Sequence, residues 1–311
     1  MVVGTLYALA AGLLWGLVFV APVLLPDYPA ALLSAGRYVA FGLIALPLAF
    51  LDRATLRSLT RADWLHALEL ALIGNVIYYA LLSAAIQRAG APLPSMIMGT
   101  LPVVIALISN RRDAARDGAL PWARLLPSLL LIGAGIACVN SAELERARLA
   151  GATDLTRYAQ GAALAAAALA CWTWYPIRNA DWLRAHTDRS PRGWATAQGL
   201  VTLPLALIAY LVWWGWSAVN GAPPAPLGPR PETFVAAMLV IALFASWAGT
   251  LFWNEASQRL PTALVGQLIV FETLAALAYA FIVRGHWPSA TTAAGIALLV
   301  AGVMWALRAF R

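Results

Sequence analysis

Lysine is absent from this 311-residue chain, so all 21 of its basic residues are arginine. An ATPase with a Walker-type phosphate-binding loop needs its lysine, and a Schiff-base enzyme needs one too, so both classes are excluded. Cysteine occurs only as Cys138 and Cys171, both in apolar stretches, which favours buried small side chains over a disulfide. The three histidines do not cluster. We therefore expect no metal and no cofactor.

Charge is also scarce, at 11% of residues, whereas 62% are hydrophobic and the mean hydropathy is +0.75. A soluble domain is roughly 45–50% apolar and about 25% charged. Runs of about 20 apolar residues recur along the chain, and no gap between them would hold a soluble domain. The sequence predicts an all-α polytopic protein in a lipid bilayer. Its net charge of +7 lies in short loops and indicates topology rather than nucleic-acid binding.

Ten transmembrane helices are expected, the first of them uncleaved because no positive region precedes it. With the N-terminus in the cytoplasm, 14 arginines fall on the inside, 6 fall on the outside and Arg37 lies within a span. This bias predicts that both termini are cytoplasmic. The expected spans are residues 4–25, 30–51, 65–87, 92–109, 123–141, 158–177, 194–216, 234–254, 262–283 and 289–307.

The two halves of the chain resemble each other. Trp15 follows a small-residue run in ALAAGLLWG, as Trp172 does in ALAAAALACW, and the pair Gln87-Arg88 aligns with Gln258-Arg259. Chance similarity among alanine- and leucine-rich helices is the alternative, but the paired Gln-Arg motifs and matching spacing favour a duplication. Five spans per half is an odd number, so the second copy would enter the membrane inverted. We expect one five-helix repeat at 1–141, a connecting loop at 142–157 and a second repeat at 158–311.

Together with Arg37 in SAGRYVAFGL and Glu272 in LIVFETLAAL, these features resemble the drug/metabolite transporter superfamily in its EamA-type ten-helix form. The resemblance covers nearly the whole chain and is nearest to bacterial amino-acid exporters, those for aromatic amino acids in particular. It implies a secondary transporter of the bacterial inner membrane. Such a protein would export aromatic and other neutral amino acids with broad selectivity, by facilitated alternating access through a central cavity.

Deep polar and aromatic side chains are the candidate cargo contacts. Asn75, Tyr78, Tyr79 and Leu82 share one helical face, and an offset of 171 puts Ser246, Thr250 and Trp253 on the matching face. The alternative is that these groups only join helices to one another. The predicted substrate-binding residues are Trp15, Asn75, Tyr78, Tyr79, Leu82, Ser246, Trp247, Thr250, Trp253 and Gln267.

Four further residues are expected to serve gating or structure. Pro102, after Gly99, should kink the fourth span, and an offset of 170 pairs that position with Glu272. The two helices are therefore candidates for moving gates. Arg37 is a possible partner for Glu272. Gly12 and Gly16 form a Gly-x-x-x-Gly motif, which indicates close helix packing.

Glu272 admits two interpretations, because an acid within the membrane is a functional candidate by default. Related small multidrug exporters couple export to protons through a glutamate in their first helix, whereas Gly4 to Leu25 here holds no acidic residue. This departure favours a structural or gating role. The alternative function is a proton-coupled exporter of drugs or other small metabolites that uses Glu272.

The cargo class follows from the shortage of deep cations. Phosphorylated solutes need several cationic groups in the cavity, and only Arg37 lies deep in a span, which favours zwitterionic or neutral cargo. An enzyme is not expected, because no Gly-x-Ser-x-Gly or His-Glu-x-x-His motif is present and no closely spaced acidic pair lies within a span. A channel would be expected to show a filter-like loop or a ring of charge, and neither is evident in the sequence. Ten spans can enclose a cavity alone, so we expect a monomer.

Overall fold

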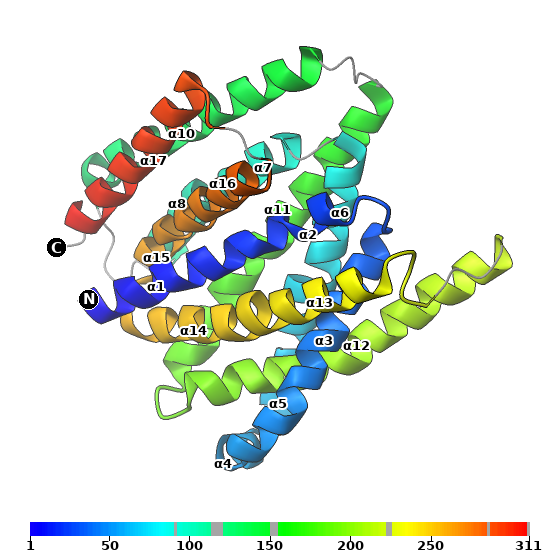
Figure 1. Ribbon diagram of the computed structural model, residues 1–311. Coiled ribbons are helices and arrows are strands. Elements are labelled where there is room, and N and C mark those ends of the chain that lie inside the picture. Colours follow the sequence, from blue (N-terminus) through cyan, green and yellow to red (C-terminus); the bar gives the residue numbers. More distant parts are fainter. Residues whose placement is uncertain (90–91, 113–120, 150–154, 222–225, 285–286, 310–311) are drawn as a thin grey trace.

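A computed structural model describes residues 1–89, 92–112, 121–149, 155–221, 226–284 and 287–309, and within these ranges every regular element is a helix (Figure 1). The elements before residue 150 are α1 (Val2–Trp15), η1 (Gly16–Phe19), α2 (Ala21–Leu24), α3 (Ala30–Leu51), α4 (Arg53–Ser58), α5 (Arg61–Leu70), η2 (Ala71–Ile77), α6 (Tyr78–Ala89), α7 (Pro92–Gly99), α8 (Leu101–Arg112) and α10 (Trp122–Leu149). Those after it are α11 (Leu155–Ala185), α12 (Pro191–Val219), α13 (Pro231–Ile241), η3 (Ala242–Ala248), α14 (Gly249–Arg259), α15 (Thr262–Leu268), α16 (Val270–Arg284) and α17 (Ala290–Ala309).

Six helical segments in the described ranges are long and apolar enough to cross a membrane. They are Val2–Leu24, Ala30–Leu51, Arg61–Ala89, Pro191–Val219, Pro231–Arg259 and Thr262–Tyr279. The remaining predicted spans coincide with the pair α7 and α8 and with α10, α11 and α17, among which Trp122–Cys138 and Ala290–Ala306 are shorter apolar stretches. The chain is thus an all-helical, multi-pass protein.

The bundle exposes apolar side chains and buries a set of polar ones within its largely apolar interior. Phe50 is 79% exposed and Val219 is 85% exposed, whereas Arg37, Asn179 and Glu272 are buried. Lipid accepts apolar surface without cost, but a polar group within the bilayer must find its partners inside the protein. These buried polar groups therefore mark the part of the interior that could bind a solute.

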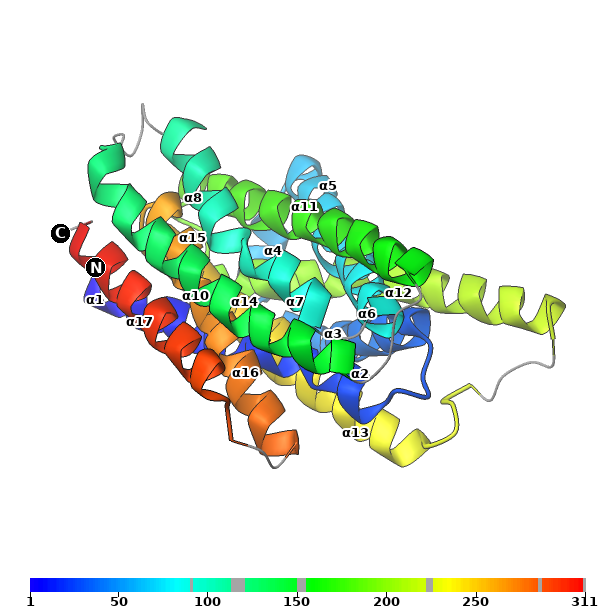
Figure 2. The ribbon, with the colours of Figure 1, turned by 90° about the horizontal axis from the view of Figure 1, so that it is seen from above.

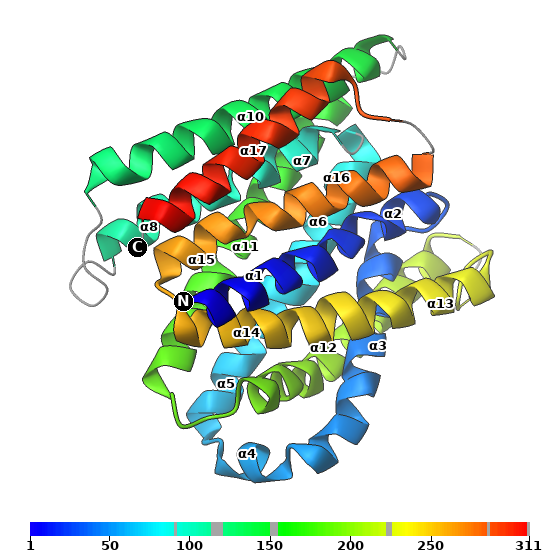
Figure 3. The same ribbon diagram turned by 60° about the vertical axis from the view of Figure 1, so that its left-hand side comes forward.

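Helix contacts are reciprocal between the two parts of the chain. The first helix, α1, packs on α14 and α16 (Figure 3), while α11 packs on α6 and α7. Helix α3 packs on α12, and α10 lies along α17 at one side of the bundle (Figure 2). Each part therefore supplies helices that contact those of the other part, so no clean division into two separate bodies exists.

Glycines allow several of these close approaches. A Cβ atom on Gly12 would lie 2.9 Å from the backbone nitrogen of Glu272, and one on Gly16 would lie 2.6 Å from the Cβ of Ala275. The packing role predicted for the Gly-x-x-x-Gly motif is thus confirmed. On α10, a Cβ on Gly135 would lie 2.7 Å from the backbone oxygen of Gly295, and on α17 one on Gly302 would lie 2.7 Å from the side chain of Ile132.

Two long helices each contain a π-helical segment, and these segments occupy corresponding positions. The segment η2 joins α5 to α6, and η3 joins α13 to α14, with both ends offset by 171 residues. A π-helical turn widens the helix and releases backbone groups from the regular pattern, and such turns are frequent at functional sites. The sequence did not predict either segment.

Two other helices are interrupted. Helix α7 ends at Gly99 and α8 begins at Leu101, close to Pro102, where we expected a kink. Helix α15 ends at Leu268 and α16 begins at Val270, an interruption that the sequence did not predict. Glu272 lies just after this second interruption, and its backbone nitrogen donates to the oxygen of Ile269 at 2.9 Å.

The expected connecting loop at 142–157 is shorter in the structure. Helix α10 continues to Leu149 and α11 begins at Leu155, while residues 150–154 lie outside the described ranges. The segment SAELERARL consists mainly of good helix formers, so the helix continues past the apolar span.

The two Gln-Arg motifs make matching contacts at opposite ends of α11. Gln87 donates from its amide to the backbone oxygen of Tyr28 at 2.6 Å, just before α3 begins. Gln258 donates likewise to the oxygen of Arg189 at 3.3 Å, just before α12 begins. Near the start of α11, Arg157 contacts the backbone of Gln87, so the two contacts lie a full helix length apart.

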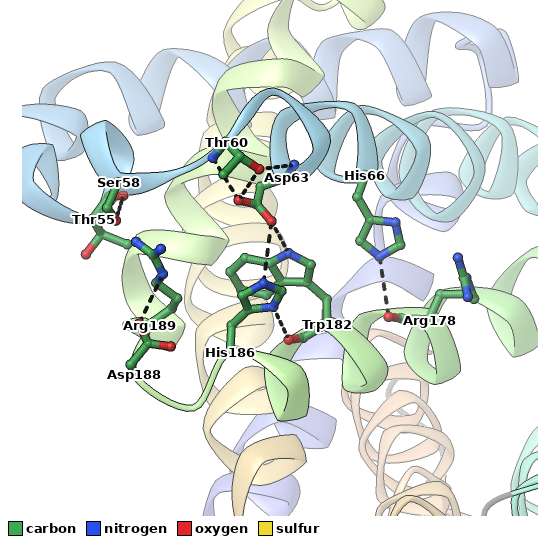
Figure 4. Close-up of polar contacts among 10 residues, drawn as sticks. All are labelled: Thr55, Ser58, Thr60, Asp63, His66, Arg178, Trp182, His186, Asp188 and Arg189. Atoms are coloured by element: carbon green, nitrogen blue, oxygen red, sulfur yellow. Dashed lines mark hydrogen bonds and ion pairs between the residues drawn. The ribbon is translucent and has the colours of Figure 1, made fainter.

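Asp63 accepts hydrogen bonds at the end of the bundle where α5 begins and α11 ends (Figure 4). It forms a capping box with Thr60, and its Oδ1 accepts from the indole N–H of Trp182 at 2.8 Å. The ring nitrogen Nε2 of His186 lies 3.8 Å from the same carboxylate oxygen. The start of α5 and the end of α11 are therefore joined at one buried carboxylate.

Candidate functional site: a buried aromatic and charged centre

Five aromatic side chains form one buried group, which we call the aromatic cluster: Trp15, Tyr78, Trp172, Tyr175 and Trp253. The ring of Trp172 stacks on Tyr78 at 4.5 Å and on Tyr175 at 5.1 Å. Trp15 meets Trp172 edge-on at 5.2 Å and packs on Trp253 at 4.9 Å. Rings from α1, α6, α11 and α14 thus meet and pack on one another in the interior.

Small residues beside the cluster make room for its rings. A Cβ on Gly249 would lie 2.7 Å from the indole nitrogen of Trp15, and one on Gly74 would lie 2.2 Å from the ring of Tyr175. Gly74 belongs to η2, and Gly249 follows directly after η3. One π-helical segment, and the residue that directly follows the other, are therefore in contact with aromatic rings of the centre.

Arg37 lies at the polar side of this centre and is 5% exposed. Its Nε donates a hydrogen bond to the hydroxyl of Ser246 at 2.9 Å. The guanidinium carbon lies 4.8 Å from the ring centroid of Tyr38 and 4.6 Å from that of Tyr79, two cation–π contacts. Its terminal Nη1 is buried without a hydrogen-bond partner.

Glu272 is 6% exposed and belongs to α16. Among the described residues, no ion pair within 4.0 Å joins its carboxylate to Arg37, although the two lie within electrostatic range. The indole N–H of Trp172 lies near the carboxylate but forms no hydrogen bond with it. The possible pair of Arg37 and Glu272 is therefore not formed in the structure, and both groups lie near rings of the aromatic cluster.

A chain of buried hydrogen bonds leads away from the cluster. The hydroxyl of Tyr175 donates to Gln198 at 2.8 Å, and the amide of Gln198 donates to Asn179 at 3.1 Å. Asn179 in turn donates to Asn254 at 2.8 Å. Sequence reasoning missed this chain, because Gln198 and Asn179 sit in long helices whose facing direction only the tertiary contacts reveal.

Most predicted cargo contacts lie near one another. Trp15, Tyr78 and Trp253 belong to the cluster, and Thr250 lies beside the hydroxyl of Tyr175. Leu82 is fully buried. Ser246 and Tyr79 hold Arg37, and the Tyr79 hydroxyl donates to the backbone oxygen of Val18 at 3.2 Å. Asn75 donates to Thr202 on α12 at 3.3 Å.

Two predicted contacts make their polar bonds elsewhere. The indole N–H of Trp247 donates to Thr196 on α12 at 3.4 Å. The amide oxygen of Gln267 accepts from Ser128 on α10 at 2.9 Å. In contrast, Trp172 and Tyr175 are central although they were not among the predicted contacts. The repeat alignment of Trp15 with Trp172 was the signal that could have found the first of them.

A separate groove of about 580 Å³ lies between α8 and α11. It is mostly apolar, with Ile108, Leu169 and Trp174 among its walls and Arg112 and Arg178 at its rim. None of the predicted cargo contacts lines it. In the described part of the chain, no three His, Cys, Asp or Glu residues gather as metal ligands would.

Comparison with known proteins agrees with this architecture. Residues 2–110 match the model of the EamA-like transporter family. Inner membrane protein YtfF of Escherichia coli (strain K12) is 54% identical over 314 residues, covering 99% of this chain and 96% of its own. A crystal structure of a protein with 19% identity superposes with a TM-score of 0.73 over 99% of both chains, a likeness of fold. The chain therefore belongs to the EamA-like transporter family and is a multi-pass protein of the bacterial inner membrane.

Proposed function

We propose that this protein exports amino acids, both aromatic and other neutral ones, by facilitated alternating access through its centre. The observation that carries the proposal is the aromatic cluster beside the buried polar groups of Arg37, Ser246 and Glu272. A ligand site is typically apolar with a few placed polar groups, and this centre has that composition. The sparse polar contacts favour broad selectivity.

The proposed architecture is ten spans in two inverted repeats, at 1–141 and 158–311, with both termini in the cytoplasm. Three observations support the repeat: the reciprocal helix contacts, the π-helical segments offset by 171 residues, and the matching contacts of Gln87 and Gln258. Inverted repeats let a transporter open alternately to either side of a site near the midplane. One copy of the chain holds the whole centre, which supports a monomer.

Movement is proposed to occur at the interrupted helices. The interruptions before Leu101 and Val270 leave short helical segments that can tilt independently, and the latter carries Glu272 next to the centre. Broken helices that border a cavity are a recurring element of transporter mechanisms. On this account Gly99 and Pro102 belong to one gate and Glu272 to the other.

The second candidate function is proton-coupled export of drugs or other small metabolites. The observation that favours it is the buried carboxylate of Glu272, which forms no ion pair with a described residue and so could exchange a proton. Neither proposal involves catalysis, a cofactor or a metal.

Transport by the purified protein in liposomes tests both candidates. Uptake of labelled phenylalanine and threonine is measured with and without a proton gradient, in the wild type and in Glu272→Gln. Facilitated export predicts uptake that unlabelled amino acids inhibit and that the proton gradient does not change. Uptake that follows the gradient in the wild type, but not in Glu272→Gln, would establish the second candidate instead. The absence of amino-acid uptake would overturn the assigned cargo.

A further inference from the structure

The centre contains two charged side chains without an opposite charge in contact. Arg37 is 95% buried and leaves Nη1 without a hydrogen-bond partner, and Glu272, 94% buried, has no ion pair among the described residues. A buried donor without a partner costs about 1–3 kcal/mol, more when it is charged. The other buried carboxylates, Asp52 and Asp63, lie at helix ends and are fully engaged there. The unpartnered charges therefore concentrate in the centre.

We propose that Arg37 and Glu272 bind the two charged ends of a zwitterionic cargo: the carboxylate at the free Nη1 of Arg37 and the ammonium group at Glu272. This inference rests on the proposed function and assigns its charge recognition to two residues. The cargo's own side chain would lie on the aromatic cluster.

The surroundings of Arg37 fix its guanidinium in place while leaving its terminal Nη1 without a hydrogen-bond partner. Ser246 accepts from Nε, and the rings of Tyr38 and Tyr79 flank the guanidinium carbon. A guanidinium held on its Nε side and by ring faces presents its terminal N–H groups as a fork that suits a carboxylate. A purely structural arginine would use its terminal nitrogens on the protein itself.

The surroundings of Glu272 place its carboxylate beside the aromatic cluster. Trp172, the central ring of the cluster, brings its indole N–H close to the carboxylate, and Gly12 of α1 packs on the backbone of Glu272. Tyr78 lies within electrostatic range of both Glu272 and Arg37, so one ring of the aromatic cluster is near both groups. A cargo with adjacent positive and negative groups and an apolar side chain matches this composition.

Ligands with a single charge fit the centre less well. An anion would satisfy Arg37 but leave Glu272 unpaired or repelled, and a cation would do the reverse. A zwitterion would satisfy both Arg37 and Glu272. The two residues come from α3 and α16, so a bound cargo would join helices of both repeats.

Competition binding on the full-length protein in nanodiscs tests the inference. Labelled phenylalanine is displaced with unlabelled phenylalanine, with phenylalanine amide, which lacks the carboxylate, and with 3-phenylpropionate, which lacks the ammonium group. In the wild type we expect both analogues to bind roughly 10- to 100-fold more weakly than phenylalanine, as expected for the loss of one charged hydrogen bond.

Variants of Arg37 and Glu272 test the recognition of the two charged ends of the cargo separately. Arg37→Gln should weaken binding of phenylalanine and 3-phenylpropionate but leave phenylalanine amide unchanged, with partial recovery in Arg37→Lys. Glu272→Gln should weaken phenylalanine and the amide but leave 3-phenylpropionate unchanged. The matched controls are Arg88→Gln and Glu69→Gln, the same changes at exposed positions, which should leave all affinities unchanged.

The outcomes distinguish this inference from the proposed function. If the wild type binds phenylalanine and both variants weaken all three ligands equally, the charge assignment is overturned while the function stands. If phenylalanine does not bind to the wild type at all, the proposed function fails together with this inference.

Gel filtration and circular dichroism identify a variant that does not fold. In that case Arg37→Lys and Glu272→Asp, which keep the charges and shift their positions, provide the comparison. Wild-type affinities for all three ligands in these two variants would also overturn the assignment.

Discussion

Gly249 of α14 lies directly against the indole of Trp15, so closely that a Cβ atom there would stand 2.7 Å from the indole nitrogen. Because that distance is shorter than real Cβ contacts, Gly249→Ala must displace Trp15 from the aromatic cluster. Overpacking of this kind costs about 1–3 kcal/mol. We expect a lower melting temperature and weaker binding of phenylalanine, measured by thermal unfolding and by displacement of the labelled ligand.

Gly215 of α12 provides the control for that substitution. Nothing lies within 4 Å of a Cβ placed on it. Gly215→Ala should be neutral or stabilising by up to about 1 kcal/mol, because alanine favours a helix. If Gly249→Ala and Gly215→Ala change the melting temperature and the binding of phenylalanine equally, the close packing of Trp15 does not account for the change.

Asp63 should be important for the stability of the end where α5 and α11 meet. Asp63→Ala removes the acceptor of Trp182 and half of the capping box with Thr60. The buried indole N–H would lose its partner, and together with the lost cap this should cost about 2 kcal/mol or more. Thermal unfolding of Asp63→Ala against Glu69→Ala, an exposed position on the same helix, measures the difference. Equal melting temperatures would show that the contacts in Figure 4 contribute little.

The loop before α3 should respond to acid through Asp27. The Arg230 guanidinium, which hydrogen-bonds to Asp27, holds the pKa of that carboxyl below its ordinary value of 3.8. The contact therefore contributes fully above that value and is lost as the pH falls through the lowered pKa. Hydrogen-exchange protection in the segment 25–29, that is the exchange rate corrected for the intrinsic rate at each pH, should fall over that acid range. In Asp27→Asn the protection should already be low near neutral pH and change little on acidification. Unchanged protection in the wild type would contradict the assignment.

Gln87 and Gln258 should control opposite ends of the transport path. Each fixes the backbone just before a helix, Gln87 at Tyr28 and Gln258 at Arg189. Gln87→Ala should favour the conformation open at the Tyr28 end, and Gln258→Ala should favour the one open at the Arg189 end. Spin-label distances across each end, measured by pulsed electron resonance, should lengthen at the mutated end only. Lengthening at both ends in either variant would argue against alternating access.

Much of the fold could be predicted from the sequence, because apolar runs and punctuating prolines reflect local physical rules. The helical segments, the interruption near Pro102 and the packing at Gly12 all follow from such rules. The π-helical segments do not, and neither does the contact that Gly74 in one of them makes with Tyr175. Residue spacing alone carries no information about such contacts.

The candidate centre was predictable only in part. Helical spacing correctly put Tyr78 on an inward face, but side-chain direction within the bundle decides the rest. Trp247 and Gln267 are both deep in their helices, yet their polar atoms bond to α12 and α10 instead. Tyr175 joins the cluster because Gly74, distant in sequence, leaves space for its ring. Pairings of this kind appear only once the helices are packed.

Counterflow is the measurement that tests the central claim most directly. Liposomes containing the wild-type protein are loaded with unlabelled phenylalanine, diluted into a trace of labelled phenylalanine without any ion gradient, and followed over time. A facilitative carrier that alternates access exchanges the two pools, so labelled phenylalanine should accumulate transiently above its equilibrium level and then decline. A monotonic approach to equilibrium, or no uptake beyond that of protein-free liposomes, would contradict the account of an alternating-access amino-acid exporter.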